Sequence, residues 1–389
     1  MAHPAPDGGD REAIQALLNR RADAIRDRDR RAFAATMKDA PGVFRSRQLR
    51  LFDHLGDLDL GLYDAEVDWG AVGDLVRDRD RSLYPDADEV AIPLTHERYR
   101  LAGYDARRVH QDLYLTFAKV DGEWSIVSDD DLDDIGLYSA RNVWDFSPVT
   151  TEPGRHFLAI GARCGGCPQV GGVLVGAAER ALSLVDEYWT RAWHRRVPLI
   201  APRSSADLAR MIQSTYPVQN YLAFAFWTGG PAQNPGVRVI VNPERVAFGD
   251  LFDVFAHELT HVAALGSRGS FTPSFVDEGL AQYVGVDGAG EAVAAADATA
   301  RSSRPRLPQD HEFFLGDGAA VFSSYQRSLS AVAFFVERFG FRRFQRFYVT
   351  LGRATRVPGT RRYHLDRAFE RVIGMDAREF ERAWASSID

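Results

Sequence analysis

The stretch VFAHELTHVAAL, residues 254–265, places two histidines four positions apart, with a glutamate directly after the first. Three polar residues, His257, Glu258 and His261, therefore interrupt a segment that is otherwise apolar nearly all round, which is typical of a buried helix. Buried polar groups need partners, and a metal ion is one way to supply them. The stretch raises the question of whether this helix binds a catalytic metal.

The helix is expected to run from about residue 251 to 265, with Asp250 as its N-cap and Gly266 at its C-terminal end. Residues i and i+4 lie one turn apart, about 5–6 Å between Cβ atoms, so both imidazoles can bind one zinc ion. Glu258 is rotated by about 100° from His257. From there it can face the metal-activated water as a general base without binding the metal.

A catalytic zinc needs a third protein ligand and one open position. The segment FTPSFVDEGLAQYVG, residues 271–285, offers Glu278 on a second, amphipathic helix that begins near Thr272-Pro273. Sixteen residues separate His261 from Glu278. That connection is long enough for a turn, a loop and a helix packed on the first one.

HELTH followed by DEGLAQY resembles the gluzincin branch of zinc peptidases, as in aminopeptidase N and the peptidase-MA-like proteins. The resemblance covers about residues 150–389 and includes the closing segment FERVIGMDAREFERAWAS. It implies one zinc per chain, with His257, His261 and Glu278 as ligands and Glu258 as general base. It also implies that Tyr325, in SSYQRSLSAVAFFVERFG, stabilises the oxyanion from the start of a later helix; a packing role is the alternative.

The chain departs from the aminopeptidases of this group. It has no Gly-x-Met-Glu-Asn loop, and the nearest stretch, WTGGPAQNPG at 227–236, has no acidic residue. Gln282 stands where relatives place a carboxylate that orients a zinc-bound histidine, and Asp277 is the alternative partner or a helix cap. The strand GVRVIVNP, 236–243, is either an edge strand that pairs with the substrate or a plain core strand.

The first half has a different pattern. Helical periodicity over residues 11–36 and 44–58 gives way to alternating strands from about residue 61, with Asp121-Gly122 as a hairpin turn. This α+β order resembles the nuclear-transport-factor-2-like (SnoaL-like) fold, a cone of helices and curved antiparallel sheet. We therefore expect two α+β domains, this one over residues 10–135 and a thermolysin-like, gluzincin domain of mixed sheet plus helices over 145–389.

No recognisable catalytic set appears in residues 1–135. The scattered His54, His96 and His110 are interpreted as surface or satisfied core histidines. The acidic run DDDLDD, residues 129–134, is interpreted as a solvated exit linker.

Composition excludes some partners. The net charge is −7 with no basic block, which argues against nucleic acid. No apolar run is long enough to span a membrane, and MAHPAPDGGD lacks a signal pattern. We expect a soluble chain, either cytoplasmic or the soluble part of an exported protein lacking its signal. Cys164 and Cys167 suggest a redox pair, half a zinc knuckle or, preferably, a loop with free or locally bridged thiols.

The leading hypothesis is a zinc-dependent hydrolase of peptide bonds, acting on a peptide or protein. A metal-stabilised binding scaffold with weak or no catalysis is the alternative. A third hypothesis makes the first half the active part, binding or converting a small molecule in the concavity of its sheet. The oligomeric state stays open.

Overall fold

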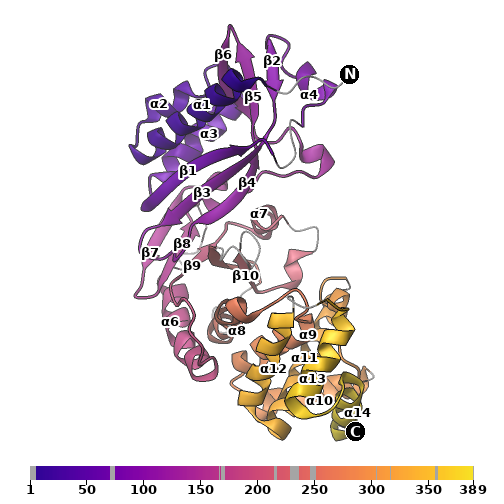
Figure 1. The fold of residues 1–389 in the computed structure, drawn as a ribbon. Coiled ribbons are helices and arrows are strands. Elements are labelled where there is room, and N and C mark those ends of the chain that lie inside the picture. The colour runs from indigo at the N-terminus through magenta and orange to yellow at the C-terminus, as the bar shows by residue number, and fades with distance from the viewer. Residues whose placement is uncertain are drawn as a thin grey trace.

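The computed structural model describes most of the chain, namely residues 6–70, 75–165, 167, 171–213, 217–227, 236–245, 251–303, 305–315, 317–354 and 358–388. It is a mixed structure of helices and sheets (Figure 1). Asp250, the expected N-cap of the helix that holds HELTH, is not among the described residues.

The front half, at the top of Figure 1, combines helices with two three-stranded antiparallel sheets, β1-β3-β4 and β2-β5-β6. Its elements are α1 (Gly8–Arg26), α2 (Arg30–Ala35), α3 (Gly42–Leu55), β1 (Leu60–Asp68), α4 (Asp78–Ser82), β2 (Glu89–Ala91), β3 (Leu94–Leu101), β4 (Val109–Tyr114), β5 (Thr116–Val120), β6 (Glu123–Ser128), a 3-10 turn (Asp133–Ile135) and α5 (Val143–Phe146).

Two long strand patterns of the sequence are each divided between the two sheets. Leu115 separates β4 from β5, and Ile92 with Pro93 separates β2 from β3. Proline has no N–H to donate to a ladder, so the break at Pro93 is expected. The hairpin between β5 and β6 turns at Asp121 and Gly122, both with positive φ (51° and 77°), as a type I′ turn requires.

The acidic run 129–134 is not a solvated linker, and that prediction was wrong. Asp129 is buried and accepts a hydrogen bond of 2.6 Å from Arg141. Asp134 accepts one of 2.9 Å from Arg77. The run therefore ties surrounding elements together, because buried carboxylates need cationic or hydrogen-bonding partners.

A five-stranded mixed sheet occupies the middle of the chain, in the order β10-β11-β9-β8-β7. β8 and β9 are parallel and connected through helix α6, while β7 and β10 pair antiparallel at the two edges. The elements are β7 (Val149–Pro153), β8 (Phe157–Ala162), α6 (Gly171–Tyr188), β9 (Val197–Ala201), α7 (Ser205–Met211), a 3-10 turn (Val218–Asn220), β10 (Ala223–Trp227) and β11 (Val237–Val241).

This strand order decides between the two alternatives for residues 236–243. β11 lies between β10 and β9, so it is the plain core strand of the two alternatives, and β10 is the edge. β10 precedes β11 in sequence and folds outward beside it as an antiparallel partner. Cys164 and Cys167, in the loop after β8, form a disulfide, which is the locally bridged form of the expected loop.

The two faces of the five-stranded sheet pack against two different hydrophobic cores. Ile160, Ile200 and Ile240 form a row across three strands and pack with the apolar residues of the front half. The neighbouring row, Ala159, Leu199 and Val239, faces the helices of the second half. Alternation of side chains along a strand produces this division. The sheet thus belongs to both halves of the chain.

A buried ion pair joins the front half to this sheet. Arg238 on β11 forms a bidentate pair with Asp105, in the β3–β4 connection, and one of the two contacts, Nη2 to Oδ2, measures 2.9 Å. Their side chains are only 7% and 2% exposed. The Arg238 guanidinium also lies over the ring of Tyr99, 5.6 Å from its centroid. Both charges are therefore compensated in the interior.

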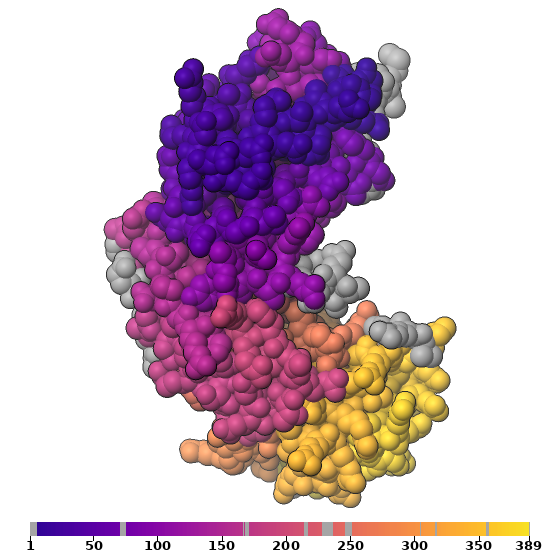
Figure 2. Space-filling view, turned by 60° about the vertical axis from the view of Figure 1, so that its left-hand side comes forward, coloured from indigo at the N-terminus to yellow at the C-terminus, as the bar shows by residue number. Residues whose placement is uncertain are grey.

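The rest of the chain is helical. It comprises α8 (Leu251–Ala264), a 3-10 turn (Leu265–Ser267), α9 (Ser274–Gly285), α10 (Gly290–Ser302), a 3-10 turn (Asp310–Phe313), α11 (Gly318–Phe339), α12 (Phe341–Arg353), α13 (Arg361–Ile373) and α14 (Ala377–Ile388). Figure 2 shows the surface hollowed between the front half and the yellow C-terminal helices. None of the helices in the described part of the chain is long and apolar enough to cross a membrane.

Candidate metal centre

Helix α8 presents both histidines of HELTH from one side. It packs between the five-stranded sheet and α9, and most of its apolar residues are buried, Phe255 and Leu259 completely. His257 and His261 stand one turn apart, with their ring centroids 4.9 Å from each other. The apolar faces of α8 are thus buried, while its two histidines face α9.

Helix α9 brings Glu278 to the same place. It begins after Pro273, and the free N–H of Ser274 donates to Asp310 at 2.8 Å. The glycine after Glu278 allows α9 to approach α11 closely: a Cβ atom on Gly279 would lie 2.7 Å from the carbonyl oxygen of Ser328. That close packing explains why the DEG segment needs glycine at its third position.

Three donor atoms converge between the two helices. Nε2 of His261 lies 3.2 Å from Nε2 of His257 and 3.2 Å from Oε2 of Glu278, and the remaining side, from His257 to Glu278, is 3.3 Å. Tetrahedral zinc with bonds of about 2.0–2.1 Å places its ligand atoms about 3.3–3.4 Å apart. The residues therefore fit a zinc ion in both donor type and spacing, and the same three form a candidate metal-binding group.

Electrostatics agree with a cation site. Burial opposes the ionisation of Glu278, but His261 and His257 outweigh it and lower the pKa of Glu278 to about 2. Burial likewise disfavours the charged form of His261, yet the carboxylates of Glu278 and Asp277 raise its pKa well above the ordinary value. The cluster thus holds anionic oxygen that attracts positive charge.

Asp277 contacts the opposite side of His261. Its Oδ2 lies 3.6 Å from Nδ1 of His261 and 3.2 Å from Nε of Arg268, while the hydroxyl of Tyr348 donates to its Oδ1 at 2.5 Å. Despite complete burial, Arg268 and His261 hold the pKa of Asp277 well below its usual range. Of the two orienting residues considered from the sequence, Asp277 has this geometry.

Gln282, the other orienting candidate, lies further along α9. Within the described residues its side chain makes no hydrogen bond to either histidine, and its backbone carbonyl oxygen accepts the helical hydrogen bond from the N–H of Val286 at 3.0 Å. The sequence pattern cannot distinguish the two positions, because Asp277 and Gln282 both lie close to Glu278 on one short helix.

Glu258 is buried beside the donor triangle. Burial raises the pKa of its carboxyl, and the neighbouring histidines oppose that rise. The backbone N–H of Ala225, on the edge strand β10, donates to the same carboxylate. Glu258 is therefore close both to the three donor side chains and to strand β10.

Tyr325 also reaches this region. Its ring centroid lies 6.2 Å from that of His257, and its ring packs edge-on against Phe313 at 5.4 Å. Burial, followed by the negative charge of Glu278, raises its pKa well above 10, so the hydroxyl stays protonated. The sequence pattern suggested that Tyr325 lies at the start of a helix. Helix α11 begins at Gly318, so Tyr325 lies inside this helix instead.

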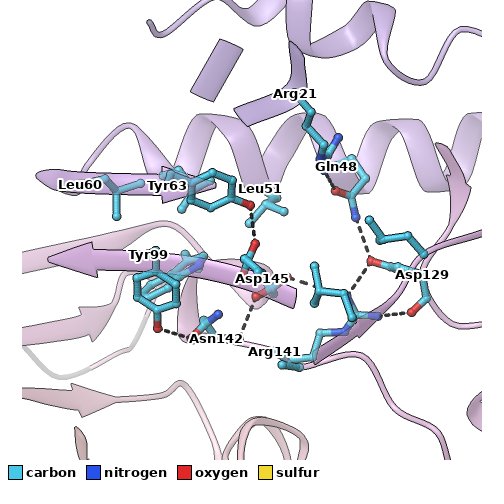
Figure 3. A pocket seen from close by; sticks show the side chains of 16 residues that line it. Arg21, Gln48, Leu51, Leu60, Tyr63, Tyr99, Asp129, Arg141, Asn142 and Asp145 are labelled. Carbon is cyan, nitrogen blue, oxygen red and sulfur yellow. Dashed lines mark hydrogen bonds and ion pairs between the residues drawn. The ribbon is translucent and has the colours of Figure 1, made fainter. Parts of the chain in front are cut away.

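Sequence reasoning missed several contributors. Tyr348 and Ala225 are distant from HELTH in sequence, Arg268 follows it by seven residues, and none of the three belongs to a motif. A second polar cluster, in the front half, was also missed: Figure 3 shows Arg21, Tyr63, Arg141 and Asp145 around a common cavity, with further residues described below. Their only signal in the sequence is a set of charged residues at otherwise apolar, inward-facing positions.

Comparison with known proteins gives a limited result. No protein-family model and no curated protein match the chain. Solved structures that resemble it include a two-domain M1 zinc metallopeptidase mutant bound to L-arginine, at 17% identity and a TM-score of 0.37 over 61% of this chain and 51% of that one. The M1 zinc metallopeptidase from Deinococcus radiodurans gives 16% identity and 0.36 over 62% and 52%. The chain spans about half the length of these structures, and a similarity this low does not assign it to their family.

Proposed function

We propose that this chain is a zinc-dependent hydrolase of peptide bonds, with one Zn²⁺ held by His257, His261 and Glu278. The observation that carries the proposal is the triangle of donor atoms, with sides of 3.2, 3.2 and 3.3 Å. The three side chains keep between 10% and 18% exposure. Three protein ligands with remaining access are typical of a catalytic site, whereas a structural zinc is normally closed by four.

When bound there, zinc supplies Lewis acidity, which polarises the scissile carbonyl and makes a water acidic enough to attack. Glu258 accepts the proton of that water and delivers it to the leaving amine. The Tyr325 hydroxyl donates a hydrogen bond to the oxyanion that develops on the carbonyl oxygen. Asp277 holds the His261 ring in the orientation that directs Nε2 toward the metal.

We propose that the substrate backbone pairs with the edge strand β10. A free sheet edge presents unpaired N–H and C=O groups, to which an extended peptide can add as another strand. Because the N–H of Ala225 points toward Glu258, this free edge faces the catalytic carboxylate. A peptide paired with β10 would therefore run past the general base.

The domain assignment belongs to the same proposal. Residues 145–389 would form the thermolysin-like, gluzincin part, in which a mixed sheet lies beside the two metal-binding helices. Residues 10–135 would form a nuclear-transport-factor-2-like domain, supported by three helices packed with antiparallel strands that bend at Leu115. Peptide or protein substrates follow from the chemistry of the site.

Zinc content is the first test. We expect about one zinc per chain by elemental analysis of tag-free wild-type protein, and a clear loss in Glu278→Ala. Gln282→Ala, on the same helix, is the matched control and should keep its zinc. If wild type holds no zinc, or if Glu278→Ala retains it, the three-ligand site is disproved.

Hydrolysis is the second test. Glu258→Gln should retain zinc and lose hydrolysis of a quenched peptide library, because an amide cannot accept the proton of the attacking water. Turnover retained by Glu258→Gln would exclude this mechanism. Zinc bound by wild type without hydrolysis of any library peptide would instead identify a metal-stabilised binding scaffold.

A further inference from the structure

The front half encloses a cavity of about 40 Å³, separate from the metal site. α1 and α3 contribute Arg21 and Gln48, and the strands β1 and β3 contribute Tyr63 and Glu97. Polar groups from the segment before and within α5 complete it (Figure 3). Its lining combines convergent polar groups with apolar side chains, as the lining of small-molecule sites does.

Arg21 is the group that lacks a partner in this cavity. It is only 7% exposed, and its Nη2 donates to Oε1 of Gln48. Its guanidinium lies over Phe33, 4.0 Å from the ring centroid. Its Nη1 has no hydrogen-bond partner, and no ion pair joins Arg21 to a carboxylate within the described part of the chain. An arginine is always charged, so this donor calls for an acceptor that carries negative charge.

The carboxylates around the cavity are engaged elsewhere. Asp129 pairs with Arg141 at 2.6 Å and accepts from Gln48 at 2.9 Å. Asp145 accepts from the backbone N–H of Asn142 at 2.7 Å, and burial raises the pKa of its carboxyl to about 6. These contacts leave the Nη1 donor of Arg21 for an incoming group.

Glu97 can take up a proton at neutral pH. It accepts a hydrogen bond from the Tyr63 hydroxyl, and burial raises the pKa of its carboxyl to about 7. The cavity is therefore less negative than its formal charges imply. Asp129 and Asp145 line the same cavity, so a singly charged carboxylate meets less repulsion there than a doubly charged phosphate would.

Apolar side chains also line the cavity, namely Leu51, Leu55, Leu60, Leu113 and Leu115. A larger cleft of about 530 Å³ adjoins it, and Gln48, Leu51, Arg141 and Asp145 line both. Tyr138 and Phe146 add apolar surface to the cleft. A ligand with a small charged group in the inner cavity and an apolar part reaching into the outer cleft fits this arrangement.

We infer that this cavity binds a small apolar monocarboxylate, with the carboxylate paired to Arg21 and the apolar part directed along Leu51 toward the outer cleft. Arginine and carboxylate form charge-assisted hydrogen bonds, and the ligand would supply the acceptor that Nη1 of Arg21 lacks within the described part of the protein. The site does not depend on zinc, and it assigns the front half a role of its own.

Calorimetric titration of the full-length protein with benzoate tests the inference. We expect saturable binding at one site per chain, at least tenfold weaker in Arg21→Gln and unchanged in Arg20→Gln, the exposed neighbour on α1. Benzamide, which has the same shape without the charge, should bind wild type at least tenfold more weakly than benzoate. The absence of saturable benzoate binding would mean that the cavity holds only water, and would overturn the inference.

Two further variants keep the result unambiguous. Glu278→Ala tests whether benzoate binds instead to a metal ion at His257, His261 and Glu278, and under the inference this variant must still bind benzoate. If Glu278→Ala loses benzoate binding and Arg21→Gln keeps it, the inference is overturned. Leu51→Trp narrows the shared wall without touching Arg21, so it decides the question if Arg21→Gln does not fold. It should weaken benzoate binding at least tenfold, and an unchanged affinity would contradict the assigned site.

Discussion

Nδ1 of His261 lies 3.6 Å from Oδ2 of Asp277, while Nε2 of the same ring lies 3.2 Å from Oε2 of Glu278. Two consecutive residues of α9 thus contact the two nitrogens of one imidazole. Carboxylate oxygens thus lie on both sides of the ring, which restricts its orientation.

Asp277→Asn is expected to lower zinc affinity by about 10- to 100-fold, since residues that orient a metal-bound histidine have effects of that size. Competition with a chromophoric chelator measures the change. Gln282→Ala is the control and should stay within about twofold of wild type. Equal losses in both variants would show that α9 as a whole, not Asp277, supports the metal.

Tyr325→Phe should lower kcat by about 10²–10³, the effect of removing one donor to a developing oxyanion, with zinc content unchanged. KM should change little, because the hydroxyl acts mainly in the transition state. Steady-state kinetics on a cleaved library peptide provide the measurement, with Tyr283→Phe on α9 as the control. Unchanged turnover would leave Tyr325 with a packing role only.

The buried pair of Arg238 and Asp105 predicts a stability effect. Arg238→Met leaves the Asp105 carboxylate buried and unpaired, which should cost about 3–5 kcal/mol of unfolding free energy. The double variant Arg238→Met/Asp105→Leu should recover much of that loss, since no charge is left unpaired. Urea unfolding followed by circular dichroism measures both, and a double variant no more stable than the single one would contradict the prediction.

Glu97 predicts a pH dependence. Its folded pKa, about 7, lies above the ordinary value of 4.5, so between these values the folded state binds the proton more tightly than the unfolded state. The resulting stability is fully present below about pH 4.5 and is lost as the pH rises to about 7. Relative to wild type, Glu97→Gln should therefore gain stability as the pH is raised from 5 to 7.5.

Glu123→Gln is the matched control for this pH series. Lys38 lowers the pKa of the exposed Glu123 below 4.5, so its contribution has the opposite sign and is lost as the pH falls. Urea midpoints at a series of pH values compare the two variants. A Glu97→Gln difference that stays flat between pH 5 and 7.5 would show that this carboxyl titrates normally.

The sequence predicted those elements that depend on interactions between residues close together in the chain. The periodicity of α8, the proline before α9 and the Asp121-Gly122 turn depend on neighbours in sequence, and the structure has these elements at the expected places. The spacing of HELTH and Glu278 likewise indicated three groups that converge in the structure.

The strand order could not be read in the same way. β10 and β11 have similar apolar sequences, and only their partners in the sheet distinguish the edge strand from the inner one. The acidic run was misjudged for a related reason, because Arg77 and Arg141, which bind it, come from other segments. Arg21 shows the same limit: its burial depends on helices and strands that meet only in the folded chain.

Because of the five-stranded sheet, the two halves of the chain cannot simply be separated. Ile160, Ile200 and Ile240 belong to the second half in sequence, but their cover comes from the first. Each such side chain loses about 1.5–3 kcal/mol of burial free energy when it is returned to water. A shorter chain cut near residue 140 would carry this uncovered row and the unpaired Arg238. It would therefore need new residues to cover that face of the sheet as well as a new N-terminus.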